Sequence, residues 1–137
     1  RIVAPRGRAS FDAAVQYCAD RKTEIWAFAN LGPTKLGGTH VGGCIYGLED
    51  AVRELAMSSK FSSAVGINTN SLLQGLRAII SVNLPAAQFE GPTKEKLANH
   101  EVESWCRDTT KKSRKEHFLQ NPSQFELLSA HFEEMRG

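Results

Sequence analysis

The sequence predicts an α+β domain in which a mixed or antiparallel sheet of about four strands is backed by helices. Three observations predict this class: strand-like alternation in residues 10–30, an apolar β-branched run in residues 76–84, and helical apolar spacing from residue 99 almost to the C-terminus. Hydrophobic residues make up 41% of the 137 residues and charged residues 23%, which excludes a disordered chain.

Two strands are predicted near the N-terminus. Apolar and mostly polar residues alternate along Ser10–Cys18, and Ile25, Ala27 and Ala29 share one face of Glu24–Asn30. The short polar link between them suits a hairpin connection. We therefore expect these two strands to pair antiparallel.

A long helix is predicted after the Gly- and Pro-rich segment Leu31–Gly38, with Thr39 as its cap. Its apolar stripe, which we expect to face the sheet, consists of Val41, Ile45, Leu48, Val52 and Leu55. Gly42, Gly43 and Gly47 each destabilise a helix by about 1 kcal/mol relative to Ala. Close packing of the helix against a backbone would explain these glycines.

The middle of the chain is predicted to be a loop followed by a strand. Ser58–Asn70 is rich in Ser, Asn and Gly and is interpreted as a mobile surface loop, with a one-turn helix beginning at Asn70 or Ser71. Leu76–Leu84 has the β-branched content and length of a buried strand, which Pro85 ends.

Helices are predicted to complete the chain. A charged loop, Gln88–Leu97, leads to Asn99, which we expect to cap a helix with a basic later part, Lys111–Lys115. A final helix begins at Asn121 with Pro122 at its first helical position, and it is expected to bury Phe125, Leu128 and Phe132. Residues 1–137 thus form one domain, with an α/β core over about 1–100 and C-terminal helices over about 100–135.

Several classes of site are disfavoured by the composition. The net charge of +2 is too small to indicate a nucleic-acid partner by itself. Cys18, Cys44 and Cys106 are odd in number and widely spaced, so neither a disulfide framework nor a zinc site is indicated. No apolar run approaches the roughly 20 residues of a membrane span. Since Arg1 replaces an initiator Met, we expect a processed chain or an excised fragment.

Three ordered segments carry a family resemblance. They are Gly37–His40 (GGTH), Gly75–Val82 (GLRAIISV), and Phe89–Leu97 (FEGPTKEKL) followed by Glu101-Val102. In order and spacing, over about Phe11–Phe118, they resemble the second, transducer domain of gyrase B and topoisomerase IV B, the ATPase-bearing subunits of type IIA DNA topoisomerases.

The resemblance implies a ribosomal-protein-like transducer fold that lies between an ATPase domain and a DNA-cleavage core, both absent here. It implies a part of an ATP-dependent type II topoisomerase that relays ATP binding and hydrolysis to DNA-gate movement during strand passage. The implied cofactors of the full-length protein are ATP and Mg²⁺, with none bound by this fragment, which is expected to be inactive alone. The implied partners are its own N-terminal ATPase domain, a gyrase A-type subunit, DNA and a second copy of the full-length protein, with no membrane partner. The implied localisation is cytoplasmic and nucleoid-associated.

Nucleotide-binding residues follow from the same resemblance. The family's loop lysine, which reaches the nucleotide pocket of the same chain, corresponds to Lys94, with Thr93 beside it. Two positions depart from the pattern: Pro92 replaces a glutamine, and Ile45 replaces an arginine that faces the DNA cavity. A divergent scaffold domain of the same fold is therefore an alternative. A mismatch-repair ATPase has a similar second domain, but the FEGPTK loop favours the topoisomerase.

A basic cluster is the candidate DNA contact. Lys111, Lys112, Arg114 and Lys115 cover a broad arc of one helix and could contact phosphates. The alternative is a solvated face with an i, i+4 pair between Lys112 and Glu116. Trp105 and Phe118 are interpreted as core residues, and His40 as the partner in a local hydrogen bond.

Overall fold

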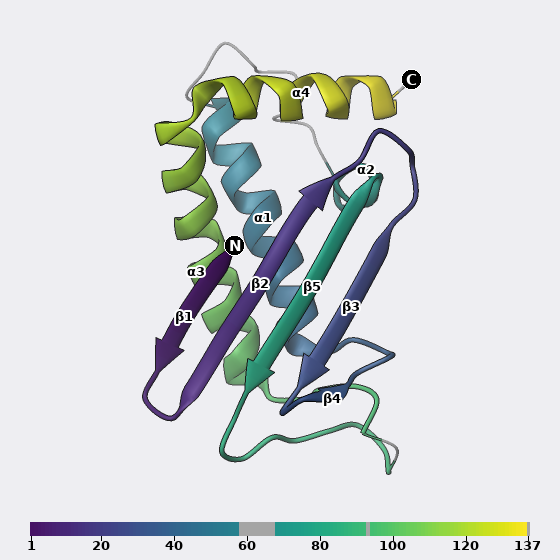
Figure 1. Ribbon diagram of the computed structural model, residues 1–137, viewed down its shortest axis with the longest axis vertical. Coiled ribbons are helices and arrows are strands. Elements are labelled where there is room, and N and C mark those ends of the chain that lie inside the picture. Colours follow the sequence, from purple (N-terminus) through teal and green to yellow (C-terminus); the bar gives the residue numbers. More distant parts are fainter. Residues whose placement is uncertain (58–67, 93, 137) are drawn as a thin grey trace.

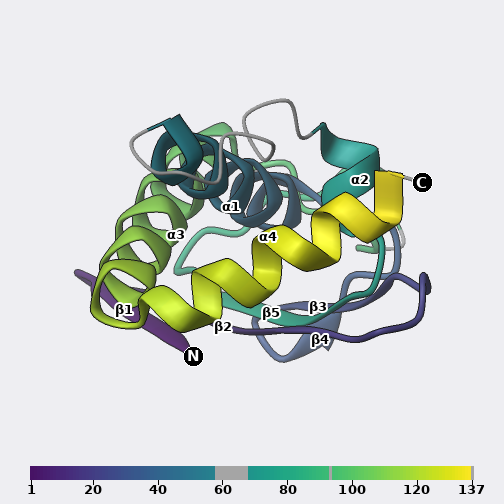
Figure 2. The ribbon, with the colours of Figure 1, turned by 90° about the horizontal axis from the view of Figure 1, so that it is seen from above.

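A mixed five-stranded sheet forms one layer of the protein, and helices cover one of its faces (Figures 1 and 2). The computed structural model describes residues 1–57, 68–92 and 94–136. The strands are β1 (Ile2–Arg6), β2 (Ala9–Tyr17), β3 (Glu24–Ala29), β4 (Gly32–Pro33) and β5 (Leu76–Asn83). They lie in the order β1-β2-β5-β3-β4. The predicted α+β class, a sheet backed by helices, is confirmed.

The predicted hairpin between β2 and β3 is wrong, because β5 lies between these strands. It pairs antiparallel with β2 and parallel with β3. The link after β2 crosses the chain just before β5, where the carbonyl oxygens of Cys18 and Asp20 lie so close to Gly75 that a Cβ at this position would collide with both. A glycine at residue 75 thus allows the crossing that places β5 in the centre.

The central strand β5 is buried on one face only. Leu76, Ala78, Ile80 and Val82 are buried, whereas Ile79 on the other face is 51% exposed. The expectation of a wholly buried strand is therefore wrong on that face. The described helices lie on the opposite face or across one end of the sheet, so no helix among them covers Ile79 (Figure 2).

The edge strands β1 and β4 had no clear sequence signal. In β1 only Ile2 is buried, and Pro5 removes a backbone donor, as an edge strand tolerates. The two residues of β4 pair with Phe28 and Ala29. Both strands are short additions to the three-stranded centre, which explains why about four strands were expected and five are present.

The helices confirm most of the predicted boundaries. They are α1 (Thr39–Met57), α2 (Thr69–Leu73), α3 (His100–Gln120) and α4 (Pro122–Arg136). Most of the predicted surface loop before α2, residues 58–67, lies outside the described residues. In the described part of the chain, no helix combines the length and apolar content needed to cross a membrane.

Close packing at two of the three helical glycines is confirmed, and the partner is α3. A Cβ on Gly43 would collide with the carbonyl oxygen of Glu103 and lie 2.9 Å from Cys106 Cβ. One on Gly47 would collide with the carbonyl oxygen of Arg107. A Cβ on Gly42 would meet the Tyr46 ring at 4.0 Å and no other described residue within that distance. The backbones of α1 and α3 therefore approach along a seam of small residues.

The buried side chains form two clusters. One lies between the sheet and the helices α1 and α3, and includes Phe11, Ile80, Val82, Cys44 and Cys106. The other packs α4 against the end of α1 and of the sheet. It includes Leu48, Val52, Leu72, Leu76, Phe125, Leu128 and Phe132. Burial of the three predicted apolar residues of α4 is confirmed. Figure 1 shows α4 at the end of the sheet opposite the segment that joins β5 to α3.

Candidate functional site

The loop that carries Lys94 closes on itself between β5 and α3. The backbone N–H of Glu90 donates to the Lys96 carbonyl at 2.9 Å, and that of Ala98 donates to Gln88 at 2.8 Å. These bonds leave Lys94 near the tip, exposed, with φ 57°. Thr93, the second predicted nucleotide-binding residue, lies outside the described residues.

The segment around Gly38 holds this loop in place. The backbone N–H of Leu36 donates to the Glu95 carbonyl at 2.9 Å, and that of Thr39 donates to the Leu97 carbonyl at 3.1 Å. Leu97 in turn donates to Gly37 at 3.1 Å. Two of the segments that carry the family resemblance, Gly37–His40 and Phe89–Leu97, therefore contact each other directly, and the loop is attached to the first turn of α1.

Asn99 fixes the base of the same loop. Its Oδ1 accepts a hydrogen bond from the Gln88 backbone N–H at 2.6 Å, and its Nδ2 donates to the Ala86 carbonyl at 3.1 Å. Asn99 is the N-cap residue of α3, as predicted, but its side chain makes no cap hydrogen bond. The amide holds the loop instead of the helix end.

His40 lies fully buried behind the loop, at the start of α1. Its Nε2 is 3.2 Å from Thr34 Oγ1, which confirms the predicted local hydrogen bond. Nδ1 is buried and has no hydrogen-bond partner among the residues that the structure describes. Burial lowers the pKa of His40 to about 4, because the surroundings disfavour the charged imidazolium.

We expect the stability of the chain to fall by about 2 kcal/mol as the pH drops from 6.5 to 4, because the unfolded His40 takes up a proton that the folded form excludes. The contribution of His40 to the free energy of unfolding is fully present above pH 6.5, the pKa of the unfolded residue. It decreases as the pH falls to about 4, the pKa in the folded protein. Urea unfolding at several pH values measures it. His40→Gln should flatten the slope in this window, and an unchanged slope would contradict the assignment.

A hollow of about 470 Å³ lies beside Lys94, between its loop and the β3–β4 turn. Lys35 lines the same hollow, and sequence reasoning missed it because it lies 59 positions away from Lys94 in an irregular segment. Among the described residues, Lys94 makes no ion pair, whereas Lys96 lies 3.4 Å from a Glu90 carboxylate oxygen. The Lys94 ammonium is thus available to a group outside this chain.

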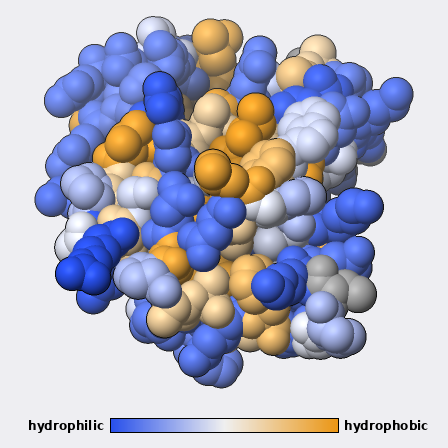
Figure 3. Space-filling view, turned by 60° about the horizontal axis from the view of Figure 1, so that its bottom comes forward, coloured by the Kyte–Doolittle hydropathy of each residue, from blue (hydrophilic) through white to orange (hydrophobic). Residues whose placement is uncertain are grey.

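The surface at this end is of mixed polarity. Leu31 is 85% exposed and Leu36 is 66% exposed, and both are next in sequence to residues that line the hollow. Figure 3, which brings the lower end of the molecule forward, shows apolar side chains gathered towards the middle of the face and hydrophilic ones around them. An apolar centre with a polar rim is typical of a protein contact surface.

The four predicted DNA-contacting residues do not form one patch. Lys111 and Lys115 lie 2.9 and 3.3 Å from the Glu54 carboxylate of α1. Lys112 is exposed, and no ion pair joins it to Glu116 among the described residues. Arg114, about 160° around the helix from Lys112, lines a cavity under α4. Lys112 is therefore the member of the cluster that is most available to a phosphate.

Other predicted core and reactive residues are placed as follows. Trp105 and Phe118 are partly buried against the two hydrophobic clusters, as predicted, and so is Ile45. Cys18, Cys44 and Cys106 are free thiols. In the described chain, no three His, Cys, Asp or Glu side chains are grouped as metal ligands.

Comparison with known proteins gives consistent relatives. The sequence model of the family described as DNA gyrase B matches residues 3–134. The DNA gyrase B protein of Archaeoglobus fulgidus is 36% identical over 121 residues, which are 87% of this chain and 19% of that protein. The corresponding protein of Chlamydia muridarum is 35% identical over 118 residues, 85% of this chain and 15% of that protein. The chain thus spans less than a fifth of the length of these curated relatives.

Solved structures agree with this result. The topoisomerase IV ATP binding domain of Francisella tularensis, solved with a small-molecule inhibitor, superposes with a TM-score of 0.88 at 28% identity. The match covers 97% of this chain and 37% of that one. The 43K ATPase domain of Thermus thermophilus gyrase B, solved with an aminocoumarin, gives a TM-score of 0.78 at 26% identity, over 98% of this chain and 36% of that one.

Proposed function

Because the chain belongs to the DNA gyrase B family, we propose that it is the transducer module of a type II DNA topoisomerase, which transmits the nucleotide state of a preceding ATPase module. The observation that carries the proposal is the exposed ammonium of Lys94, unpaired within the described chain and held by a loop attached to α1. An ammonium is a compact charge with three donors and fits a phosphate oxygen.

The contacts of the loop offer a route for the signal. The bond from the Thr39 N–H to Leu97 joins the loop to α1, and the tight seam at Gly43 and Gly47 joins α1 to α3. α3 leads directly into α4 through Asn121. Closely packed helices move as a unit, so a displacement of the Lys94 loop would tilt the helices together.

The proposed partners follow from the family. ATP and Mg²⁺ are proposed cofactors of the intact protein, and ATP supplies the free energy of the cycle. Lys94 offers one charged contact to the nucleotide, while the rest of that site is proposed to belong to the preceding module. A gyrase A-type subunit, DNA and a second copy of the chain are the other proposed partners.

The proposed contact with DNA is modest. The single Glu54 carboxylate offsets one of the two charges of Lys111 and Lys115, and Arg114 lines a cavity under α4. The lysines of the cluster therefore keep only about two positive charges for phosphates, one of them on the exposed Lys112. Affinity for DNA depends on how many phosphates are neutralised. We therefore propose that this helix guides DNA weakly and does not hold it.

Lys94→Ala in the full-length protein, assembled with its partner subunit, is expected to reduce ATP-dependent supercoiling or relaxation by about tenfold to hundredfold, the range for one charge-assisted contact. Plasmid topology assays measure activity, and titration with a non-hydrolysable ATP analogue measures nucleotide affinity. The matched control is Lys96→Ala in the same loop, whose lysine pairs internally with Glu90 and should leave activity within about twofold. Full activity in the Lys94 variant would refute the coupling role.

A further inference from the structure

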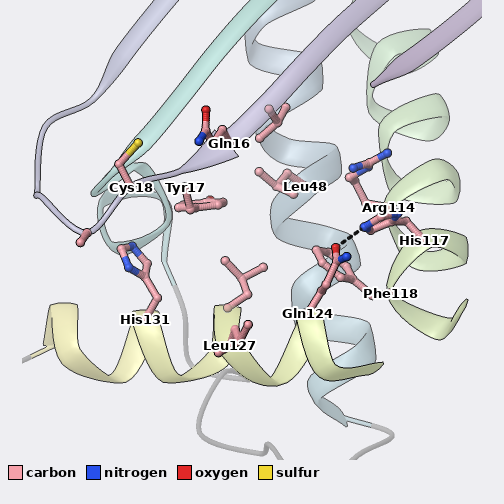
Figure 4. Close-up of a pocket in the computed structure, with 13 residues that line it drawn as sticks. Gln16, Tyr17, Cys18, Leu48, Arg114, His117, Phe118, Gln124, Leu127 and His131 are labelled. Carbon is pink, nitrogen blue, oxygen red and sulfur yellow. Dashed lines mark hydrogen bonds between the residues drawn. The ribbon is translucent and has the colours of Figure 1, made fainter. Parts of the chain in front are cut away.

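A cavity of about 400 Å³ lies under α4, at the end of the sheet remote from the loop that carries Lys94, and its lining residues are drawn in Figure 4. β2, α3 and α4 form most of its walls, and Leu48 of α1 and the residues just after β2 complete them. Val15, Phe118 and Leu128 are among its apolar lining residues. Concave, mainly apolar sites of roughly 300–1,000 Å³ with a few polar groups are typical of small-molecule binding. The proposed function uses none of these side chains.

The cavity contains an uncompensated positive charge. Thirteen residues line it, and none of them is Asp or Glu. The Arg114 side chain lies in its wall and is half-buried. Its Nε is buried and has no hydrogen-bond partner within residues 1–57, 68–92 and 94–136. Its Nη2 donates a hydrogen bond to the neighbouring Ser113 hydroxyl, at 3.3 Å. A guanidinium that is partly removed from water and has no carboxylate beside it is destabilised until an anion binds.

Three other polar side chains in the wall already make hydrogen bonds, and the amide of a fourth, Gln124, supplies a second donor besides Arg114. His117 Nε2 lies 2.6 Å from Gln124 Oε1, the pair joined by a dashed line in Figure 4. With its carbonyl oxygen engaged, the Gln124 amide keeps its NH₂ group for another acceptor. The Tyr17 hydroxyl and the His131 ring are bonded to the backbone oxygens of Leu72 and Gln74, at 2.8 and 2.9 Å. The cavity therefore offers donors on the side of α3 and the start of α4, and apolar surface elsewhere.

We propose that this cavity binds a small organic carboxylate with a flat apolar body. The carboxylate accepts hydrogen bonds from the Arg114 guanidinium, which presents donors in a planar fork. The apolar body fills the space between Val15, Phe118 and Leu128. A phosphate backbone would not fill this apolar depth, so the ligand is a small molecule and not DNA. Because β2, α3 and α4 all contribute walls, the bound ligand braces α4 against the rest of the protein.

The test uses naphthalene-2-carboxylate and its neutral analogue naphthalene-2-carboxamide as probes of the isotope-labelled 137-residue chain. In two-dimensional NMR titrations, the carboxylate is expected to bind about tenfold more tightly than the carboxamide. The chemical shift changes should centre on the residues that line the cavity, in β2, α3, α4, the middle of α1 around Leu48 and the residues just after β2. Arg114→Gln should abolish this preference. Lys112→Gln removes the same charge from another side of the same helix and should keep it.

Equal binding of the two probes, retention of the preference in Arg114→Gln, or shifts centred on residues that do not line the cavity would overturn the proposal. So would failure of the carboxylate to bind at millimolar concentration. Should Arg114→Gln not fold, Ala19→Trp provides the second variant, since Ala19 is an exposed residue of the cavity wall and a large ring there should block entry. Undiminished binding to that variant would equally place the ligand elsewhere.

Discussion

Gly47→Ala is expected to lower the free energy of unfolding by about 3 kcal/mol, although alanine is the better helix former. The added Cβ would collide with the Arg107 carbonyl oxygen and lie 2.9 Å from Thr110 Cβ. Neither neighbour can withdraw alone, because the first is helix backbone and the second is attached directly to it. The helices α1 and α3 must therefore separate along the seam. Urea denaturation of the isolated chain measures the loss.

Gly42→Ala is the matched control on the same helix. Its Cβ would meet only the Tyr46 ring, at 4.0 Å, so the gain in helix propensity should dominate and stabilise the chain by up to about 1 kcal/mol. If Gly47→Ala lowers the free energy of unfolding and Gly42→Ala raises it, the effect of helix packing is separated from that of helix propensity at two glycines five positions apart. Stabilisation by both substitutions would show that the two helices are not held as closely as described.

Local patterns predicted the elements well where a strong period coincides with a clear end. Thr39 at the start of α1 and Pro122 at the start of α4 are examples, because capping chemistry and apolar spacing agree there. The pairing of β2 with β3 was wrong because it depends on β5, a strand almost fifty residues later in the chain. A short polar link between two strands does not record which strand is inserted between them.

The sequence predicted which residues belong to the candidate site, but not how they are arranged in space. The resemblance indicated Lys94, but the hydrogen bonds that attach its loop to Gly37 and Thr39 join residues about 60 positions apart in the sequence. Arg114 was grouped with the lysines of α3 by sequence proximity alone. A turn of about 100° per residue carries it away from Lys112, towards α4. The basic residues of α3 differ in their surroundings because different elements pack against each side of the helix, and the local sequence does not specify those elements.

Gly38→Ala is expected to have the largest effect of the substitutions considered, a loss of about 4 kcal/mol in the free energy of unfolding. Two penalties combine at this position. The backbone has φ 131°, which side chains other than glycine rarely adopt, and a Cβ would lie 2.5 Å from both the backbone nitrogen and the carbonyl oxygen of Leu97. These Leu97 atoms make the bonds that attach the Lys94 loop to α1, so relief of the collision must detach the loop.

The control for backbone strain alone is Gly7→Ala, where φ is 61° and no described residue lies within 4 Å of the added Cβ. A loss of only about 1 kcal/mol in the free energy of unfolding is therefore expected. The excess in Gly38→Ala then measures the contact between the loop and α1. In the full-length protein, at a temperature where the variant remains folded, ATP-dependent activity should fall as far as in Lys94→Ala. The reason is that movement of Lys94 on a detached loop is no longer transmitted to α1. Normal coupling in a folded, full-length Gly38→Ala variant would mean that the signal leaves Lys94 by another route.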